Sequence, residues 1–200
     1  SFEIELPPHG STFVVFNNNS RSKLPAVAAI KKGTTETIIS GPWKVSFPPN
    51  WGAPPSVVFD QLISWTESKD TGIKYFSGTA VYHNSFNVTV GAGKKVIMLN
   101  LGELRDVAEV FINGKSAGIL WKKPYQADIS QLVQPGMNDL KIEVVNMWIN
   151  RVTGDMLLNP KDRFTKTNQT YMKSEVWPGG DETFRIQTAG LLGPVTVTEK

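Results

Sequence analysis

The residues most able to do chemistry are carboxylates outside the predicted strands. Hydrolysis of a glycosidic bond needs two Asp or Glu side chains on either side of the scissile bond. Spacing along the chain does not measure their separation in space, and turns use the same residue types. Solvated loop carboxylates are therefore the favoured interpretation, with paired catalysis as the alternative. The candidates in predicted loops are Glu103, Asp106, Asp155, Glu175, Asp181 and Glu182.

Other catalytic chemistries are largely excluded by residue counts. The chain has two histidines and no cysteine, which excludes thiolate nucleophiles and Cys-based zinc sites and argues against His triads. The glycine-rich run 91–95 lacks the spacing and the Ser or Thr of a phosphate loop, so it is interpreted as a strand connection. A net charge of +3 with scattered Lys and Arg does not favour nucleic acid as a partner.

Aromatic side chains suggest a second chemistry, the binding of sugar. Tryptophans near strand ends or in irregular segments could stack on a pyranose ring, although core or domain contact is favoured for any single one. Arg151 and Asp155 lie four positions apart; an ion pair is the favoured role, and a bidentate contact from Arg151 to sugar hydroxyls is the alternative. The candidate carbohydrate-binding residues are Trp121, Trp148, Asn150, Arg151, Asp155, Glu175 and Trp177.

Short strands joined by turns must position these residues. Alternating apolar residues at 107–112 and 115–121 flank Asn113-Gly114, which predicts a hairpin with a type I′ turn. Leu140, Ile142 and Val144 alternate with charged residues and predict a strand with one buried face. This spacing indicates an all-β sandwich. Further strands are predicted at 12–16, 43–47, 78–84, 96–101 and 193–198.

Three segments interrupt this pattern. Residues 128–133 predict one helical turn capped by Asp128. From 146 to about 185 the alternation fails, which predicts a long irregular segment of the kind that is functional or packs against another domain. A composition shift near 40 divides the chain into 1–40, either the edge of a preceding domain or outer strands of the same sandwich, and 41–200, the sandwich itself.

The fold expectation becomes more specific through a resemblance. Residues 99–104 (LNLGEL), 108–115 (AEVFINGK) and 118–121 (GILW) resemble the galactose-binding-like jelly roll of family 2-type glycoside hydrolases. The resemblance narrows to the C-terminal region of α-L-rhamnosidases of glycoside hydrolase family 106, and it covers about residues 43 to 198. The segments that narrow it are WKVSF at 43–47, LISWT at 62–66, YFSGTAVY at 75–82, NMWINR at 146–151 with Gly154-Asp155, and GLLGPV at 190–195.

The resemblance implies a function without a catalytic pair. In those enzymes the catalytic carboxylates belong to a separate (β/α)8 barrel, and no stretch here alternates strands with helices in that way. We therefore expect a non-catalytic accessory sandwich of a bacterial glycoside hydrolase that supports the barrel and contacts carbohydrate. An autonomous carbohydrate-binding module and, more weakly, a hydrolase in its own right are the alternatives.

The same resemblance carries expectations about location, cofactor and partners. It implies a periplasmic or cell-surface parent enzyme that degrades polysaccharides, although residues 1–5 show no signal-peptide pattern. It also leaves room for a structural calcium ion, since oxygen ligands suit Ca²⁺, with no ligands assigned. The expected partner is carbohydrate or a neighbouring catalytic domain of the same chain. No apolar stretch is long enough to predict a membrane span.

Overall fold

The computed structural model describes residues 35–89, 96–166 and 186–199, together with residues 4, 6 and 11–13. Contacts divide the chain into two units, Ser1–Gly33 and Thr34–Lys200. Strand β1 (Thr35–Ile38) pairs with a strand near the C-terminus, so it belongs to the larger unit. Whether the residues before it close a preceding domain stays a prediction. The strand predicted at 12–16 lies mainly outside the described residues.

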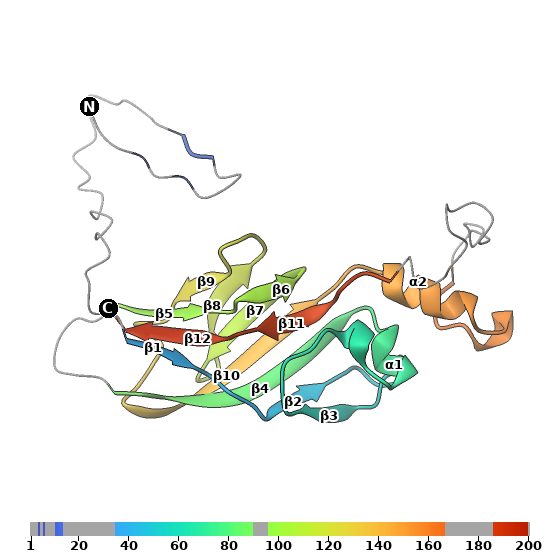
Figure 1. Ribbon diagram of the computed structural model, residues 1–200, viewed down its shortest axis with the longest axis horizontal. Coiled ribbons are helices and arrows are strands. Elements are labelled where there is room, and N and C mark those ends of the chain that lie inside the picture. Colours follow the sequence, from blue (N-terminus) through green and yellow to red (C-terminus); the bar gives the residue numbers. More distant parts are fainter. Residues whose placement is uncertain are drawn as a thin grey trace. The chain divides into compact units, whose positions relative to one another are not determined.

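Two antiparallel sheets form the body of the larger unit (Figure 1). One has six strands, in the order β3 (Ser56–Phe59), β2 (Trp43–Ser46), β4 (Thr79–Val88), β10 (Gly136–Val145), β7 (Val107–Ile112) and β8 (Lys115–Leu120). The other has four, in the order β1, β12 (Thr196–Glu199), β5 (Ile97–Asn100) and β9 (Gln126–Asp128). A small third sheet pairs β11 (Gly190–Gly193) with β6 (Glu103–Arg105).

The core lies between the two larger sheets because each buries one face. Leu140, Ile142 and Val144 of β10 are fully buried, as the alternation predicted, and they share one apolar cluster with Leu99 of β5 and Val197 of β12. Face-to-face packing of two antiparallel sheets is the sandwich architecture. The predicted all-β sandwich is confirmed.

The hairpin is also confirmed. Strands β7 and β8 pair antiparallel, and the turn residues Asn113 and Gly114 have φ of 51° and 78°. Positive φ at both central positions is the requirement of a type I′ turn, which Asn-Gly meets at low cost. The predicted single turn after Asp128 is present too: the Ser130 N–H donates to Asp128 Oδ1 at 2.9 Å, and the Leu132 N–H donates to the Ile129 carbonyl at 2.9 Å.

The expectation of an irregular segment from 146 onward is wrong in its described part. Residues 149–156 form helix α2 (Ile149–Met156), and a 3-10 turn follows at η2 (Pro160–Asp162). Two short elements, η1 (Trp65–Glu67) and α1 (Thr71–Lys74), connect β3 to β4. Figure 1 shows α1 and α2 at the same end of the six-stranded sheet. No helix in the described ranges is long and apolar enough to cross a bilayer.

Candidate functional site

Helix α2 buries polar residues where a surface helix would bury apolar ones. Arg151 is 3% exposed and Asp155 is fully buried, and Arg151 Nε lies 3.0 Å from Asp155 Oδ1. The predicted ion pair is therefore present, on consecutive turns of a helix rather than in a loop. Nε and Oδ1 complete no well-aligned hydrogen bond, so the contact is mainly electrostatic. The other carboxylate oxygen, Oδ2, accepts from Thr165 N and Oγ1 at 2.7 and 2.6 Å.

The surroundings of Arg151 hold its guanidinium in place. Its backbone N–H donates to Ser77 Oγ at 3.0 Å, and its Cζ lies 4.7 Å from the centre of the Phe164 ring, a cation–π contact. Burial lowers the pKa of Arg151, and the Asp155 carboxylate offsets part of that effect. A cation that is removed from water in this way gains from any further hydrogen-bond acceptor that reaches it.

Asn150 has a structural role. Its side chain is 1% exposed; Nδ2 donates to the Gln187 carbonyl at 2.7 Å, and Oδ1 accepts from the Gln187 N–H at 2.7 Å. These two bonds tie α2 to the segment that leads into β11. Asn150 therefore satisfies backbone groups and has no free edge for a ligand.

Three aromatic rings lie beside the ion pair. Trp51 makes edge-to-face contacts with Trp148 at 5.7 Å and with Phe164 at 6.2 Å between ring centres. Trp51 Nε1 donates to the Ser77 carbonyl at 2.6 Å, which fixes its ring. Trp148 remains 57% exposed, so part of its indole faces solvent. We call Trp51, Trp148 and Phe164 the aromatic cluster.

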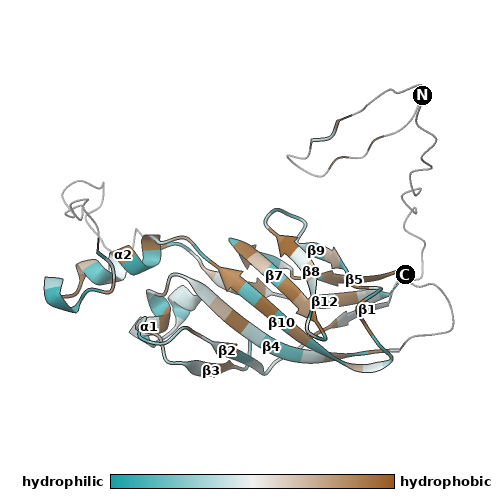
Figure 2. Ribbon diagram, turned by 180° about the vertical axis from the view of Figure 1, so that it is seen from behind, coloured by the Kyte–Doolittle hydropathy of each residue, from teal (hydrophilic) through white to brown (hydrophobic). Residues whose placement is uncertain are grey.

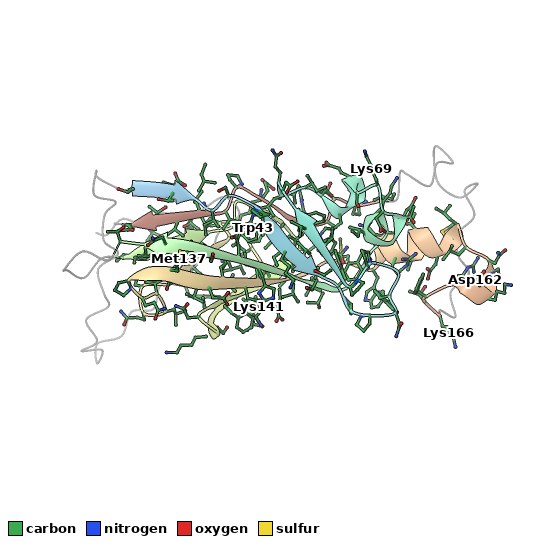
Figure 3. The ribbon with its side chains drawn as sticks, turned by 90° about the horizontal axis from the view of Figure 1, so that it is seen from below. Trp43, Lys69, Met137, Lys141, Asp162 and Lys166 are labelled. Carbon is green, nitrogen blue, oxygen red and sulfur yellow. The ribbon has the colours of Figure 1, made fainter. Side chains whose placement is uncertain are left out.

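Two cavities meet at Phe164. The first, which we call the arginine pocket, has a volume of about 300 Å³ and is lined by Gly52, Thr71, Gly72, Tyr75, Arg151, Gly154, Leu157, Leu158 and Phe164. The second, the aromatic pocket, has a volume of about 330 Å³ and is lined by Trp51, Trp148, Val152, Phe164, Thr165 and Lys166. Both reach the lower end of the size range typical of small-ligand sites. Figure 3 shows Lys166 and Asp162 at one end of the larger unit and Met137 at its opposite end.

The structure does not bring Trp121 to these cavities. Trp121 follows β8 and is 66% exposed, with Lys122 Nζ 5.7 Å from its ring centre. Because Leu120 pairs with Ala108 and Ala108 with Val144, it lies two strands, or about 10 Å, from the end of β10. Trp148, Arg151 and Asp155 of the predicted set do converge. Glu175 and Trp177 lie outside the described residues.

The described carboxylate candidates all have partners within the chain. Glu103 Oε1 lies 2.7 Å from Lys123 Nζ, and this hydrogen bond lowers the pKa of Glu103. Asp106 Oδ2 accepts from the Met147 N–H at 3.1 Å, and Asp155 is buried against Arg151 and Thr165. The remaining candidates, Glu175, Asp181 and Glu182, lie outside the described residues. Within the described ranges, no group of three or more His, Cys, Asp or Glu gathers where a metal ion could be held.

Sequence reasoning missed several residues that build the site. Gly52, Tyr75 and Phe164 come from segments far from α2 in sequence, and nothing in their spacing predicts that they meet it. Trp51 is also a tryptophan near a strand end, but the predicted carbohydrate-binding set did not include it. The one available signal was the pair Trp51-Gly52, in which an aromatic residue precedes a glycine. Gly52 has a φ of +92°, which glycine tolerates and other residues rarely adopt.

Comparison with known proteins now places the fold. The model of the family described as "Glycosyl hydrolase 2 galactose-binding domain-like" matches residues 54–191. The chain belongs to this family. The match covers helix α2 and strands of both sheets, with β1, β2 and β12 outside it. The arginine pocket and the aromatic cluster therefore lie within the matched residues apart from Trp51 and Gly52 just before them. The resemblance seen in the sequence is therefore confirmed.

Relatives of this galactose-binding-like domain are much longer proteins. A protein of Formosa agariphila, named provisionally as a beta-glucuronidase, is 36% identical over 84% of this chain. The solved rhamnosidase from Novosphingobium sp. PP1Y is 34% identical over 87% of this chain, with a TM-score of 0.74. The chain spans 16% of the length of each. The beta-D-glucuronidase of Dictyoglomus thermophilum shares the fold, with a TM-score of 0.59 at 19% identity over 86% of this chain and 29% of its own.

Proposed function

We propose that this domain is a non-catalytic accessory sandwich of a bacterial glycoside hydrolase of the α-L-rhamnosidase type, which supports the catalytic domain of the same parent chain. The observation that carries the proposal is the match to a solved rhamnosidase with 34% identity and a TM-score of 0.74, of which this fold makes up 16%. The rest of such a protein is long enough to contain a separate catalytic domain. The proposed location is the periplasm or the cell surface.

The three carboxylate candidates in the described residues are bound to other groups of the chain, which supports a non-catalytic role. A glycosidase needs one carboxyl group as acid and a second as base or nucleophile, both reaching the scissile bond. Glu103 and Asp106 are held by Lys123 and the Met147 N–H, and Asp155 is fully buried beneath Arg151 and Thr165. None of these three lines either cavity.

An activity assay tests the proposal. The purified chain is incubated with an aryl α-L-rhamnoside and an aryl β-D-glucuronide, and release of the aryl group is followed by absorbance. We expect no turnover above a no-protein blank. Turnover that a Glu175→Gln or Asp181→Asn variant abolishes would show that the chain is itself a hydrolase. Sequencing the parent reading frame is expected to show a barrel-length segment beside this domain.

A second function, carbohydrate binding by the isolated domain, is favoured by one observation. The exposed part of Trp148 borders a pocket of about 330 Å³ that also contains Trp51 and Phe164. Aromatic faces of this kind can stack on the C–H surface of a pyranose. Calorimetric titration with plant cell-wall oligosaccharides tests it: heat that disappears in Trp148→Ala supports a binding module, and no heat across the panel excludes one.

The structural calcium ion stays a prediction. A thermal melt with and without a chelator decides it, because an ion bound only by the folded state raises the unfolding midpoint. A midpoint that chelation leaves unchanged would argue against a tightly held ion.

A further inference from the structure

The arginine pocket contains hydrogen-bond donors that the domain itself does not use. Arg151 uses its backbone N–H on Ser77, its Nε on Asp155 and its planar face on Phe164. Nη1 and Nη2 make no hydrogen bond to the described residues and are not among the fully buried polar atoms, although Arg151 as a whole is only 3% exposed. The outer edge of this nearly buried cation is therefore accessible beside a cavity, where a hydrogen-bond acceptor can reach it.

Two glycines keep the backbone close to that edge. A Cβ at Gly52 would lie 3.2 Å from Arg151 Nη1 and 3.2 Å from Phe164 Cζ. A Cβ at Gly154 would lie 2.5 Å from Arg151 Nη2 and 2.5 Å from Tyr75 Cβ. Both glycines line the arginine pocket, and Gly52 has a φ of +92°, which other residues rarely adopt. Any side chain at either position would crowd the guanidinium.

The chemistry of this edge favours an anion. The two Nη groups of a guanidinium form a planar fork that matches the two oxygens of a carboxylate. Asp155 balances the charge at Nε, but it is fully buried and its other carboxylate oxygen accepts from Thr165. Lys166 adds a cation at the neighbouring aromatic pocket. The walls of the arginine pocket are apolar at Leu157 and Leu158, which suits a compact ring.

We propose that the arginine pocket binds the carboxylate of an acidic monosaccharide, a hexuronate, through Nη1 and Nη2 of Arg151. The proposal rests on the carbohydrate-binding role above, extends it from the aromatic pocket to the arginine pocket that meets it at Phe164, and names a ligand class. The carboxylate accepts two N–H bonds, and the pyranose ring lies between Tyr75 and the leucine wall. Arg151 keeps its ion pair with Asp155 in the bound state, so binding requires no rearrangement of α2.

Calorimetric titration of the whole chain with matched sugars tests this. D-glucuronate and D-galacturonate are compared with D-glucose and D-galactose, which differ only at the C6 carboxylate, and with acetate, which carries the carboxylate without the ring. We expect a hexuronate to bind at least about tenfold more tightly than its neutral counterpart, because charge-assisted hydrogen bonds are roughly twice as strong as neutral ones.

A variant that spares the ion pair makes the test specific to the pocket. Leu157 lines the arginine pocket and is 48% exposed, so Leu157→Glu should fold and place a competing carboxylate there. Met137→Glu, at a residue 59% exposed at the opposite end of the larger unit (Figure 3), introduces a carboxylate far from the pocket. We expect Leu157→Glu to abolish hexuronate binding and Met137→Glu to retain it, with both thermal midpoints close to that of the parent.

The outcomes separate this inference from the role on which it rests. Equal binding of glucose and glucuronate would overturn the preference for acid and leave carbohydrate binding intact. Acetate that binds as tightly as glucuronate would show that the sugar ring contributes nothing to binding and would overturn the proposed ligand class. Binding that Leu157→Glu leaves unchanged would place the site elsewhere. No heat from any of these monosaccharides would overturn the inference, while the oligosaccharide titration decides the binding role separately and the accessory role stands in either case.

Discussion

The six-stranded sheet and helix α2 bury opposite kinds of residue. Along β10 the buried positions are Leu140, Ile142 and Val144, whereas in α2 the buried positions include Asn150, Arg151 and Asp155. Figure 2 shows the contrast in hydropathy between the strands, with brown segments, and the mainly pale and teal α2. The sheet gains stability by removing apolar surface from water. The helix instead needs each buried polar group to be matched by a partner.

The difference teaches where function is to be sought. Burying an ion pair contributes little net stability, because desolvation of two charges offsets most of their attraction. A helix with an apolar buried face could cover this end of the sandwich without needing hydrogen-bond or ion-pair partners for its side chains. The retained Arg151, with an unused donor edge beside a cavity, therefore points to binding rather than to folding. Four predictions probe this contrast.

The largest expected effect lies in the apolar core. Trp65 is fully buried, makes edge-to-face contacts with Phe47 and Phe76, and donates from Nε1 to the Tyr82 hydroxyl at 2.6 Å. Trp65→Ala should lower the free energy of unfolding by about 3–5 kcal/mol, measured by urea denaturation. Trp121→Ala, at a residue 66% exposed, is the matched control and should change it by less than about 0.5 kcal/mol. Equal effects would contradict the core assignment.

Breaking the ion pair of α2 should have the next largest effect. Asp155→Asn leaves the Arg151 cation buried without its counter-charge and should cost about 3 kcal/mol in the same denaturation experiment. The double variant Arg151→Met with Asp155→Leu removes both charges and should recover most of that loss. If the double variant is as unstable as the single one, the pair contributes more to folding than the contrast with the sheet implies.

The pH dependence of stability tests the apolar core separately from helix α2, through the buried hydroxyl of Tyr82. Burial raises the pKa of Tyr82 to about 12, because the hydroxyl is desolvated in the core. The unfolded chain ionises Tyr82 near pH 10, so its contribution is complete below that pH and is lost as pH rises to about 12. The expected loss is about 2–3 kcal/mol. Denaturation midpoints across this range measure it, and Tyr82→Phe should remove that part of the slope.

The smallest effect on stability should come from the aromatic cluster. Trp148 is 57% exposed, so Trp148→Ala should lower the free energy of unfolding by less than about 1 kcal/mol. The same variant should lose carbohydrate binding at the aromatic pocket, because it removes one wall. A large loss of stability with binding unchanged would assign this tryptophan to packing and weaken the distinction between the two regions.

Most of the sandwich could be predicted from local patterns. Alternation in β10 and the Asn113-Gly114 turn specify strand register, because a slip of one residue would expose the entire apolar face. Helix α2 could not be found in this way. Ile149, Val152 and Met156 do recur at helical spacing, but the helix is only eight residues long and buries its polar face, so the segment was predicted to be irregular.

The candidate site was predicted only in part. The ion pair of Arg151 and Asp155 was predicted from their closeness along the chain in a segment expected to be irregular, whereas the structure forms it across one turn of a helix. The predicted carbohydrate-binding set also included Trp121 and Asn150. The fold instead places Trp121 two strands away, and it commits Asn150 to the backbone of Gln187.

The amino-acid sequence by itself determined the fold class, the hairpin, the register of the central strands and the relation to glycoside hydrolases, because these depend on periodicity and local turn chemistry. Only the tertiary structure decided the arginine pocket. Gly52, Tyr75, Arg151 and Phe164 come from four segments, and they meet because α1 and α2 lie at the same end of the six-stranded sheet. Which polar groups lose water, and which donor edge stays free, follows from that packing and from no pattern along the chain.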